Sequence, residues 1–237
     1  KLINYEIDGV KVFRLPIYKP IPYFKFNNRT LTRHNNLIMK VLRNYNFNPD
    51  LVIGHWGNPQ LKLLKSLKMY DQKIKTILTL HYDGEKLFKM YKDSFLNDLK
   101  YIDLIGFRNL SDKNSFTNKY EYLNKKTFIC PSGLPKSFYL NIKKIDSRFS
   151  NFIFIGTLIK RKYPEIIIDS LYKIFSKRFT MTFVGSGYLI KSIKKNVKKY
   201  NLKSVFFHYR LSRDEVISKL DKSDCLIMVS KDEAFGL

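Results

Sequence analysis

Two histidines directly follow predicted strands in the first half of the chain, and each precedes a loop that contains glycine. His55 follows the apolar run 51–54, and His81 follows the run 76–80. Ligands of open α/β sheets bind beyond the carboxyl ends of the strands, so both imidazoles are expected close to a ligand. One histidine in such a place is more often a structural residue, but two at equivalent strand ends favour a binding or catalytic site.

Three consecutive cations follow a predicted strand in the second half. Gly156 lets the backbone turn after the strand 151–155, and Lys160, Arg161 and Lys162 then precede the next predicted helix. Cations beside a helix N-terminus are unfavourable unless an anion lies between them. A phosphate would satisfy both the cations and the free N–H groups. The turn therefore predicts a phosphate site, and a solvated basic turn is the alternative.

Two more loops of the second half follow predicted strands. Gly185 and Gly187 form a Gly-x-Gly turn, which a tight connection between strand and helix would explain equally well. In the loop 228–237, Glu233 lies beside a glycine-containing turn. Its carboxylate could accept hydrogen bonds from hydroxyls, while backbone N–H groups meet a charged oxygen. An ordinary solvent-facing loop is again the alternative.

Several well-known catalytic motifs are missing from the sequence. It has no Gly-x-Ser-x-Gly elbow, Walker loop, HExxH motif or six-residue dinucleotide fingerprint. It also has no Asp-x-Asp pair that could hold a divalent metal on a diphosphate. If a diphosphate binds, Lys, Arg and backbone N–H groups must neutralise it, so we expect no metal.

The elements that would position these residues alternate between strands and helices. Such alternation predicts parallel sheets with helices on both faces. A polar junction at 141–150 separates two such runs, predicting domains at 1–147 and 148–237. Ser212 and Glu215 have the spacing of a capping box, and Thr30 is a candidate helix cap. The predicted strands are 11–15, 50–54 (buried), 74–80, 102–107, 127–130, 151–155, 180–184, 204–208 and 224–229, and the predicted helices are 30–45, 60–69, 86–91, 112–118, 164–175, 188–200 and 212–220.

Composition and charge restrict the class of protein. The chain has 237 residues, 44% of them hydrophobic and 15% aromatic, enough for a buried core. Its apolar runs are far shorter than a membrane span. Cys130 and Cys225 are predicted to be buried thiols in a reducing compartment.

The net charge of the chain is +24, from 44 basic and 20 acidic residues. Residues 1–147 carry +14 (26 basic against 12 acidic residues), and residues 148–237 carry +10 (18 against 8). This spread is compatible with nucleic acid, an anionic membrane or phosphorylated ligands, and selects none of them.

Taken in order, the motifs of the second half resemble those of the retaining GT-B glycosyltransferases of family 4, the group 1 glycosyl transferases. The segment 154–162, Phe-Ile-Gly-Thr-Leu-Ile-Lys-Arg-Lys, is similar to the first donor-domain strand and phosphate loop of that family. The segment 183–187, Phe-Val-Gly-Ser-Gly, resembles its V-G-x-G turn. The segments 205–216 and 223–237 are similar to the following strand and helix and to the opening of its E-x7-E signature.

The first half carries the weaker part of the resemblance. Asn-Pro-Asp-Leu-Val-Ile-Gly-His-Trp-Gly at 48–57 resembles the family's P-D-hydrophobic-H strand. Thr-Leu-His-Tyr-Asp-Gly at 79–84 resembles its T-x-H-G loop. Cys-Pro-Ser-Gly-Leu-Pro-Lys-Ser-Phe at 130–138 resembles its link between domains.

The resemblance implies two Rossmann-like parallel-sheet domains facing a cleft: an acceptor-side domain at 1–147 and a nucleotide-sugar domain at 148–237. Each domain would continue beyond the given sequence, which we expect to be a fragment that is inactive by itself. The implied enzyme transfers a sugar from a nucleotide-sugar, with a UDP-sugar favoured, to a glycan or lipid-linked acceptor. It would retain the anomeric configuration and act in cell-surface polysaccharide synthesis.

The resemblance also implies roles for particular residues. His81 and Glu233 would be catalytic and close to the transferred sugar, with His55 in the cleft. Arg161, Lys162 and Gly156 would bind the donor diphosphate without a metal. Backbone N–H groups would reach the sugar and phosphate. The residues that would supply those N–H groups are Phe235, Gly236 and Leu237. The residues that would lie near the nucleotide are Gly185, Gly187 and Arg210.

Two positions depart from the family pattern. Thr157 stands where many members have arginine after the strand glycine, and Arg161 would substitute for it. Tyr209 stands where the family usually has a glycine.

We expect a cytoplasmic protein that contacts an anionic membrane leaflet peripherally. We expect no nucleic-acid partner. A basic nucleic-acid-binding protein and a GT-B-like nucleotide-sugar epimerase remain the alternatives.

Overall fold

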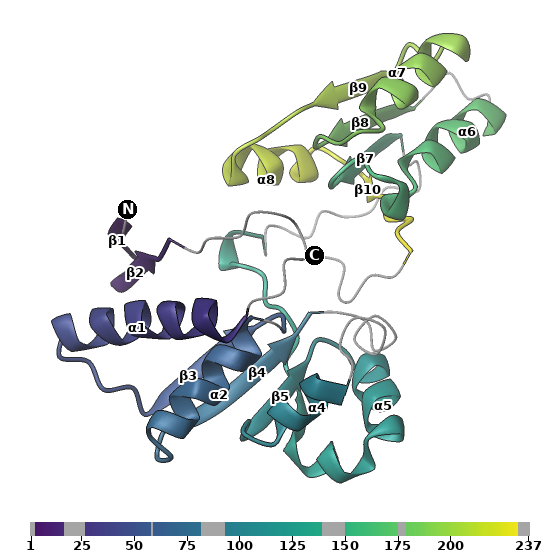
Figure 1. Cartoon of the computed structure of the whole chain (residues 1–237). Coiled ribbons are helices and arrows are strands. Elements are labelled where there is room, and N and C mark those ends of the chain that lie inside the picture. The colour runs from purple at the N-terminus through teal and green to yellow at the C-terminus, as the bar shows by residue number, and fades with distance from the viewer. Residues whose placement is uncertain are drawn as a thin grey trace. The chain divides into compact units, whose positions relative to one another are not determined.

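The protein divides into two compact units, unit 1 (Lys1–Pro131) and unit 2 (Ser132–Leu237). Figure 1 colours unit 1 from purple to teal and unit 2 from teal to yellow. The computed structural model describes residues 3–16, 27–57, 59–81, 93–138, 150–174 and 179–231. Each unit contains a parallel sheet of its own. The boundary predicted at 147 stays a prediction, because residues 139–149 lie outside the described residues.

Unit 1 is built on the parallel sheet β3-β4-β5-β6, in which every strand pairs with the next strand of the sequence. The register sets His55 opposite Thr79 and Leu80 opposite Phe107. The carboxyl ends of the strands therefore meet at one edge. The elements of the sheet and its helices are α1 (Asn28–Asn44), β3 (Leu51–His55), α2 (Gln60–Tyr70), β4 (Lys75–Leu80), α4 (Asp93–Leu99), β5 (Leu104–Phe107), α5 (Leu110–Lys119), the 3-10 helix η1 (Glu121–Lys126) and β6 (Thr127–Ile129).

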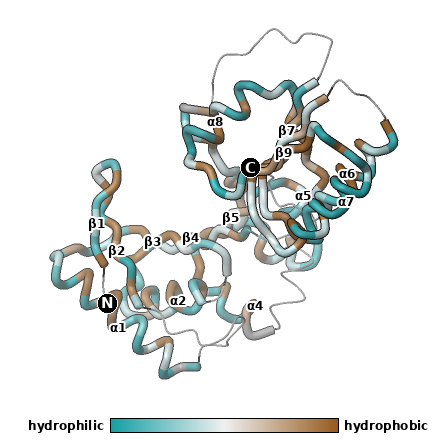
Figure 2. The backbone as a smooth tube through the Cα atoms, turned by 90° about the horizontal axis from the view of Figure 1, so that it is seen from above, coloured by the Kyte–Doolittle hydropathy of each residue, from teal (hydrophilic) through white to brown (hydrophobic). Residues whose placement is uncertain are grey.

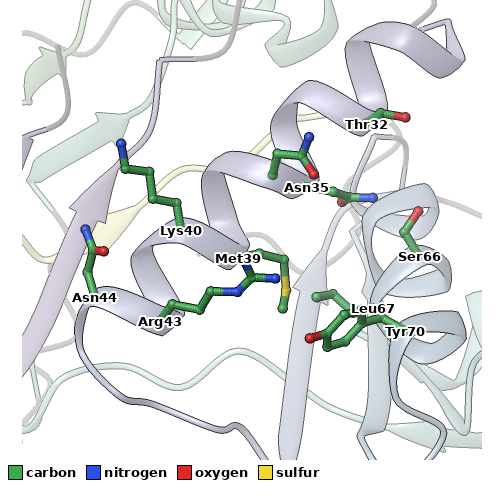
Figure 3. A pocket seen from close by; sticks show the side chains of 10 residues that line it. Thr32, Asn35, Met39, Lys40, Arg43, Asn44, Ser66, Leu67 and Tyr70 are labelled. Atoms are coloured by element: carbon green, nitrogen blue, oxygen red, sulfur yellow. The ribbon is translucent and has the colours of Figure 1, made fainter.

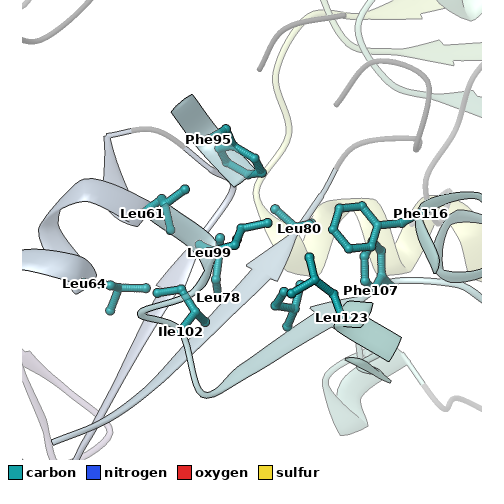
Figure 4. Packing of buried hydrophobic residues seen from close by; sticks show 11 residues of the cluster. Leu61, Leu64, Leu78, Leu80, Phe95, Leu99, Ile102, Phe107, Phe116 and Leu123 are labelled. Atoms are coloured by element: carbon teal, nitrogen blue, oxygen red, sulfur yellow. The ribbon is translucent and has the colours of Figure 1, made fainter. Parts of the chain in front are cut away.

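The core of unit 1 forms where α2, α4 and α5 meet the middle strands (Figure 4). The fully buried aromatic rings of Phe107 and Phe116 lie 5.1 Å apart in a tilted arrangement, within the favoured range for aromatic pairs. Figure 2 shows short hydrophobic stretches in β3 and β4, whereas hydrophobic and hydrophilic residues alternate along α1. The remaining members of the cluster are Leu61, Leu64, Leu78, Leu80, Phe95, Leu99, Ile102, Ile105 and Leu123.

An antiparallel hairpin precedes this sheet. β1 (Ile3–Ile7) pairs with β2 (Val10–Arg14). Asp8 and Gly9, at φ of 50° and 76°, form the turn between them. Positive φ at both central residues is the signature of a tight hairpin turn, and Asp-Gly is among its preferred sequences. The sequence prediction included the second strand and missed the first.

Unit 2 contains the parallel sheet β10-β7-β8-β9, in which the last strand returns to pair with the first. Its core packs Phe154 and Phe183 of the sheet against Ile168 and Leu171 of α6. The Asp224 carboxylate accepts hydrogen bonds from the backbone N–H of Ser150 and Asn151 and holds β10 beside β7. The elements are the 3-10 helix η2 (Lys136–Phe138), β7 (Asn151–Ile155), the 3-10 helix η3 (Lys160–Lys162), α6 (Pro164–Ile174), β8 (Thr180–Val184), α7 (Ile190–Lys199), β9 (Val205–His208), α8 (Arg213–Asp221) and β10 (Cys225–Leu226).

The capping box predicted for α8 is confirmed. The Ser212 side chain accepts from the Glu215 N–H, and the Glu215 carboxylate accepts from the Ser212 N–H at 2.7 Å. The cap predicted for α1 is wrong. The side chain of Asn27 accepts from the N–H of Thr30, so the cap precedes Thr30 and the helix begins at Asn28.

Other sequence predictions also need correction. β3 is not a buried strand: it has one paired neighbour in the described sheet, and Leu51 and Ile53 are about half exposed. The last strand has two residues rather than six. Cys130 and Cys225 are free but only partly buried, because each lies at or beside the end of a short strand. The predicted helix 86–91 lies outside the described residues, and α4 and η1 were not predicted.

Candidate functional site

The carboxyl edge of the unit 1 sheet brings the two strand-end histidines into contact. His55 ends β3 and His81 follows β4. The Nδ1 atom of His55 lies 3.2 Å from the Nε2 atom of His81. The hydroxyl oxygen of Thr79 lies 2.6 Å from that same Nδ1 atom and 3.4 Å from the carbonyl oxygen of Gly54. A chain of polar contacts therefore runs along the ends of these two strands.

A third strand end adds a cation that the sequence prediction missed. Arg108 directly follows β5, and its guanidinium lies 2.6 Å from the Nε2 atom of His81. A second guanidinium N–H donates to the backbone carbonyl of Cys130, after β6, at 3.1 Å. Reading the residue after every strand, rather than the histidines alone, would have found Arg108.

Trp56 covers one face of the His81 ring. The two rings are stacked with centroids 4.4 Å apart and planes 19° from parallel. The backbone of Trp56 has a φ of 84°, a region that bulky residues rarely adopt. Its N–H donates to the carbonyl of Thr79 at 2.9 Å, which helps hold this conformation. Backbone strain of this kind is enriched at functional sites.

The surroundings of His81 keep its imidazole neutral. Burial lowers the pKa of His81, and the positive charge of Arg108 and the second imidazole, His55, lower it further, to about 4. At neutral pH the ring therefore carries no charge. It can donate or accept a hydrogen bond, but it does not act as a cation toward a ligand.

In unit 2, the three cations predicted to bind phosphate form the turn η3, between β7 and α6. The turn ends at Tyr163, in the left-handed conformation with φ of 47°, and α6 begins at Pro164. The backbone N–H of Lys160 donates to the Tyr188 hydroxyl at 2.9 Å, and the Arg161 carbonyl accepts from the N–H of Lys231. The loops after β7, β8 and β10 are thus joined by hydrogen bonds.

The Gly-x-Gly turn packs directly against the loop that follows β7. A Cβ on Gly185 would lie 2.0 Å from the carbonyl oxygen of Gly156, and one on Gly187 would lie 2.2 Å from that of Leu158. Gly185 also has a φ of 139°. Both positions therefore require glycine because two backbones approach closely. The predicted proximity of these glycines to a nucleotide stays a prediction.

The remaining predicted site residues are not brought together by the described structure. Arg210 lies exposed after β9. Glu233, Phe235, Gly236 and Leu237 lie outside the described residues. In the part of the chain that the structure describes, no three His, Cys, Asp or Glu side chains could hold a metal ion together.

A hollow of about 600 Å³ lies between α1 and α2 of unit 1 (Figure 3). Its charged side chains are Lys40 and Arg43, and no carboxylate lines it. The sequence prediction did not find it, because its residues come from two separate helices. The other lining residues are Thr32, Asn35, Asn36, Met39, Asn44, Ser66, Leu67 and Tyr70.

Comparison with known proteins bears on both units. Residues 135–237 match the family model described as "Glycosyl transferases group 1". An uncharacterized glycosyltransferase of Methanocaldococcus jannaschii, MJ1178, is 29% identical over 196 residues, 79% of this chain and 51% of that protein. The chain thus spans about half the length of this curated relative.

Solved structures show the same fold at low sequence identity. The lipopolysaccharide outer core galactosyltransferase WaaB is similar with a TM-score of 0.61 and 13% identity, over 87% of this chain and 57% of that one. Anabaena Alr3699/HepE, solved with UDP and glucose, is similar with a TM-score of 0.62 and 16% identity, over 87% of this chain and 59% of that one. The predicted fold class is confirmed: the chain is an α/β protein with parallel, Rossmann-like sheets, as in GT-B glycosyltransferases.

Proposed function

We propose that this chain is part of a retaining GT-B glycosyltransferase of family 4. The enzyme would move a sugar from a nucleotide-sugar to a glycan or lipid-linked acceptor. The match of residues 135–237 to a glycosyl transferase family and the likeness to the glycosyltransferase of M. jannaschii support this class. The UDP bound to the similar Anabaena protein favours a UDP-sugar as donor.

The observation that carries the proposal is the placement of the η3 cations. Lys160, Arg161 and Lys162 occupy one turn at the carboxyl end of a parallel strand and directly before α6. Arg161 and Lys162 would neutralise the donor diphosphate through their charged side chains. Gly156, directly after β7, would let the backbone turn toward the diphosphate.

Stabilising the leaving diphosphate would be the main chemical contribution of this turn. Preorganised cations lower the activation free energy most where negative charge develops in the transition state. Aligning the acceptor with the donor would supply a further share of the rate. We propose that Glu233 and His81 contact the sugar and that no metal takes part.

Nucleotide binding tests this proposal. Thermal unfolding is followed with a panel of UDP-, GDP- and ADP-sugars, with and without EDTA. A ligand present at 100 times its Kd adds about 2.7 kcal/mol to the free energy of unfolding. At roughly 2–4 °C per kcal/mol for a chain of this size, the Tm should rise by about 5–10 °C. The shift should be largest for a UDP-sugar and should survive EDTA.

The double variant Arg161→Ala/Lys162→Ala should lose that shift. The matched control is Lys198→Ala/Lys199→Ala, which removes two exposed positive charges from the last turn of α7 in the same unit and should keep it. No shift with any nucleotide-sugar, or an equal loss in both double variants, would contradict the donor site.

We further propose a cytoplasmic enzyme that contacts an anionic membrane surface through α1. This helix presents Arg29, Arg33, Lys40 and Arg43 as exposed cations and carries no carboxylate. Each basic residue near an anionic leaflet contributes about 1 kcal/mol. None of the helices in the described part of the chain is long and apolar enough to span a membrane.

Sedimentation with vesicles tests this contact. The chain should bind vesicles that contain phosphatidylserine and leave neutral phosphatidylcholine vesicles in solution. Arg33→Gln/Lys40→Gln should weaken binding, while Lys198→Gln/Lys199→Gln should affect it less. Equal binding to neutral vesicles would contradict the proposal.

Two alternatives predict other outcomes. A nucleic-acid-binding protein would bind RNA or DNA with strong salt dependence and would show no shift with nucleotide-sugars. A GT-B-like epimerase would bind the nucleotide-sugar and change its sugar without any acceptor, which product analysis would detect.

A further inference from the structure

Arg108 brings a positive charge to the carboxyl edge of the unit 1 sheet without a matching negative charge. It directly follows β5, and its side chain is only partly exposed. Among the described residues, two ion pairs form, Lys65–Asp98 and Lys68–Asp103. Neither involves Arg108. Charged groups that leave water are normally paired with an opposite charge. Within the described part of unit 1, Arg108 therefore lacks the partner that a partly buried cation usually has.

The guanidinium of Arg108 also meets few hydrogen-bond acceptors, although all its N–H groups are donors. One Nη atom donates to the Cys130 carbonyl at 3.1 Å. The Nε atom is buried and has no hydrogen-bond partner in the described structure. The other Nη atom lies 2.6 Å from Nε2 and 3.4 Å from Nδ1 of His81. These distances place it beside the imidazole ring rather than in line with a nitrogen lone pair, so the donors of Arg108 are poorly satisfied.

The two carboxylates closest to Arg108 in the sequence are held by other groups. Asp103 precedes β5, at the opposite end of the strand, and pairs with Lys68 at 2.9 Å. Asp112 accepts a hydrogen bond from the side-chain amide of Asn109 at 2.9 Å. Neither carboxylate neutralises Arg108.

The groups beside Arg108 suit a sugar. The indole of Trp56 is 48% exposed and stacks on the imidazole of His81, which in turn contacts Arg108. Small-molecule sites typically combine aromatic surface with a few polar or charged groups that fix the orientation of the ligand. The planar guanidinium of arginine matches the oxygens of a carboxylate or a phosphate. A sugar that carries such an oxyanion would satisfy both parts of this edge.

We propose that Arg108 binds an oxyanion of the acceptor, so that the acceptor is an acidic saccharide with a carboxylate or a phosphate group. The inference rests on the function proposed above, in which unit 1 is the acceptor-side domain. It names a substrate class through contacts that lie entirely within unit 1. The oxyanion would supply the negative charge and the acceptors that Arg108 lacks, and Trp56 would pack against the sugar ring.

Fluorescence of Trp56 tests the proposal, because it is the only tryptophan of the chain. The full chain is titrated with glucuronate, with glucose 6-phosphate and with uncharged methyl glucoside, using excitation at which tyrosine absorbs little. At least one acidic sugar should change the Trp56 emission in a saturable way. Methyl glucoside should bind at least about tenfold more weakly, since hydrogen bonds to charged groups contribute that much.

The variant Arg108→Gln should weaken binding of the acidic sugar by about 10- to 100-fold and leave methyl glucoside unaffected. Arg108→Lys keeps the positive charge and should recover part of the affinity. The matched control is Lys126→Gln. It removes another cation of unit 1, which donates to the carbonyls of Lys100 and Ile102, and should bind the acidic sugar as the unmodified chain does.

Several results would overturn the proposal. They are the absence of acidic-sugar binding, equal affinity for acidic and uncharged sugars, and an equal loss in Arg108→Gln and Lys126→Gln. Inorganic phosphate binding as tightly as glucose 6-phosphate would also overturn it, because the sugar would then play no part. A larger Tm shift with UDP-glucuronate than with UDP-glucose, lost in Arg108→Gln, would assign the oxyanion to the donor instead.

The free sugars contain no nucleotide, so the two proposals fail separately. Loss of acidic-sugar binding would not count against the donor site of unit 2. A failure of the nucleotide-sugar panel would not change how Arg108 discriminates between acidic and uncharged sugars.

Discussion

Alanine substitutions at four glycines separate backbone strain from steric overlap. Gly185 combines a φ of 139° with a Cβ position 2.0 Å from the Gly156 carbonyl oxygen. Gly187 has the overlap, 2.2 Å from the Leu158 carbonyl oxygen, without that strain. Gly9 has a φ of 76° and open space, and Gly133 has open space and no positive φ. Each substitution adds the same single methyl group.

The expected losses in the free energy of unfolding follow from backbone strain and steric overlap. Gly133→Ala should be neutral or stabilise by about 0.4–1 kcal/mol, because alanine restricts the unfolded chain. Gly9→Ala should lose about 1–2 kcal/mol from its left-handed backbone. Gly187→Ala should lose about 1–3 kcal/mol from overpacking. Gly185→Ala carries the strain as well and should lose about 2–6 kcal/mol.

Thermal unfolding of the four variants measures these differences, at roughly 2–4 °C per kcal/mol. Binding of UDP should weaken in Gly185→Ala and Gly187→Ala, since the loop carrying η3 must move. It should be unchanged in Gly9→Ala and Gly133→Ala. If Gly185→Ala proved as stable as Gly9→Ala, the close contact of the two loops would be refuted.

The remaining predictions concern stability. Ser212→Ala removes one half of the α8 capping box and should cost about 1 kcal/mol, seen as a lower Tm that Ser212→Asp largely restores. Burial raises the pKa of Asp103, but hydrogen bonds from Lys68 and Thr76 outweigh it and leave the pKa below its usual value. Asp103→Asn should therefore destabilise at pH 7, and its deficit in urea unfolding should shrink as the pH falls below about 4; a deficit that did not change with pH would argue against the charge. Phe107→Ala opens a cavity among fully buried side chains and should lower the free energy of unfolding by about 3–5 kcal/mol. Denaturant unfolding measures this loss, and a loss below about 1 kcal/mol would contradict the prediction.

Much of the fold could be predicted from the sequence because the strands and helices have distinct apolar patterns. β7 and β8 were predicted to the residue, and Ser212 and Glu215 mark the start of α8 by a local contact. Hairpin strand β1 was missed although Asp8-Gly9 is a strong turn signal. The exposure of β3 could not be foreseen, because it depends on its place at the edge of the described sheet rather than on its own apolar residues.

A site residue could be predicted where its position in the sequence, directly after a strand, is enough to locate it. The positions of His55 and His81 follow from the rule on strand ends, and their contact follows from the β3–β4 register. The contact between His81 and Arg108 was missed, because Arg108 comes from a third strand end, 27 residues further along the chain. The reason for Gly185 and Gly187 was likewise hidden, since the backbone they contact belongs to another loop.

The two sheets also differ in the order in which they can assemble. In unit 1, each strand from β4 to β6 pairs with the strand made just before it, so the sheet can grow as the chain leaves the ribosome. In unit 2, β10 must pair with β7, and Asp224 must reach Ser150, 74 residues earlier. Closing so long a loop costs entropy before any contact is gained. Unit 2 therefore completes its sheet last, after unit 1 has had time to fold as a body of its own.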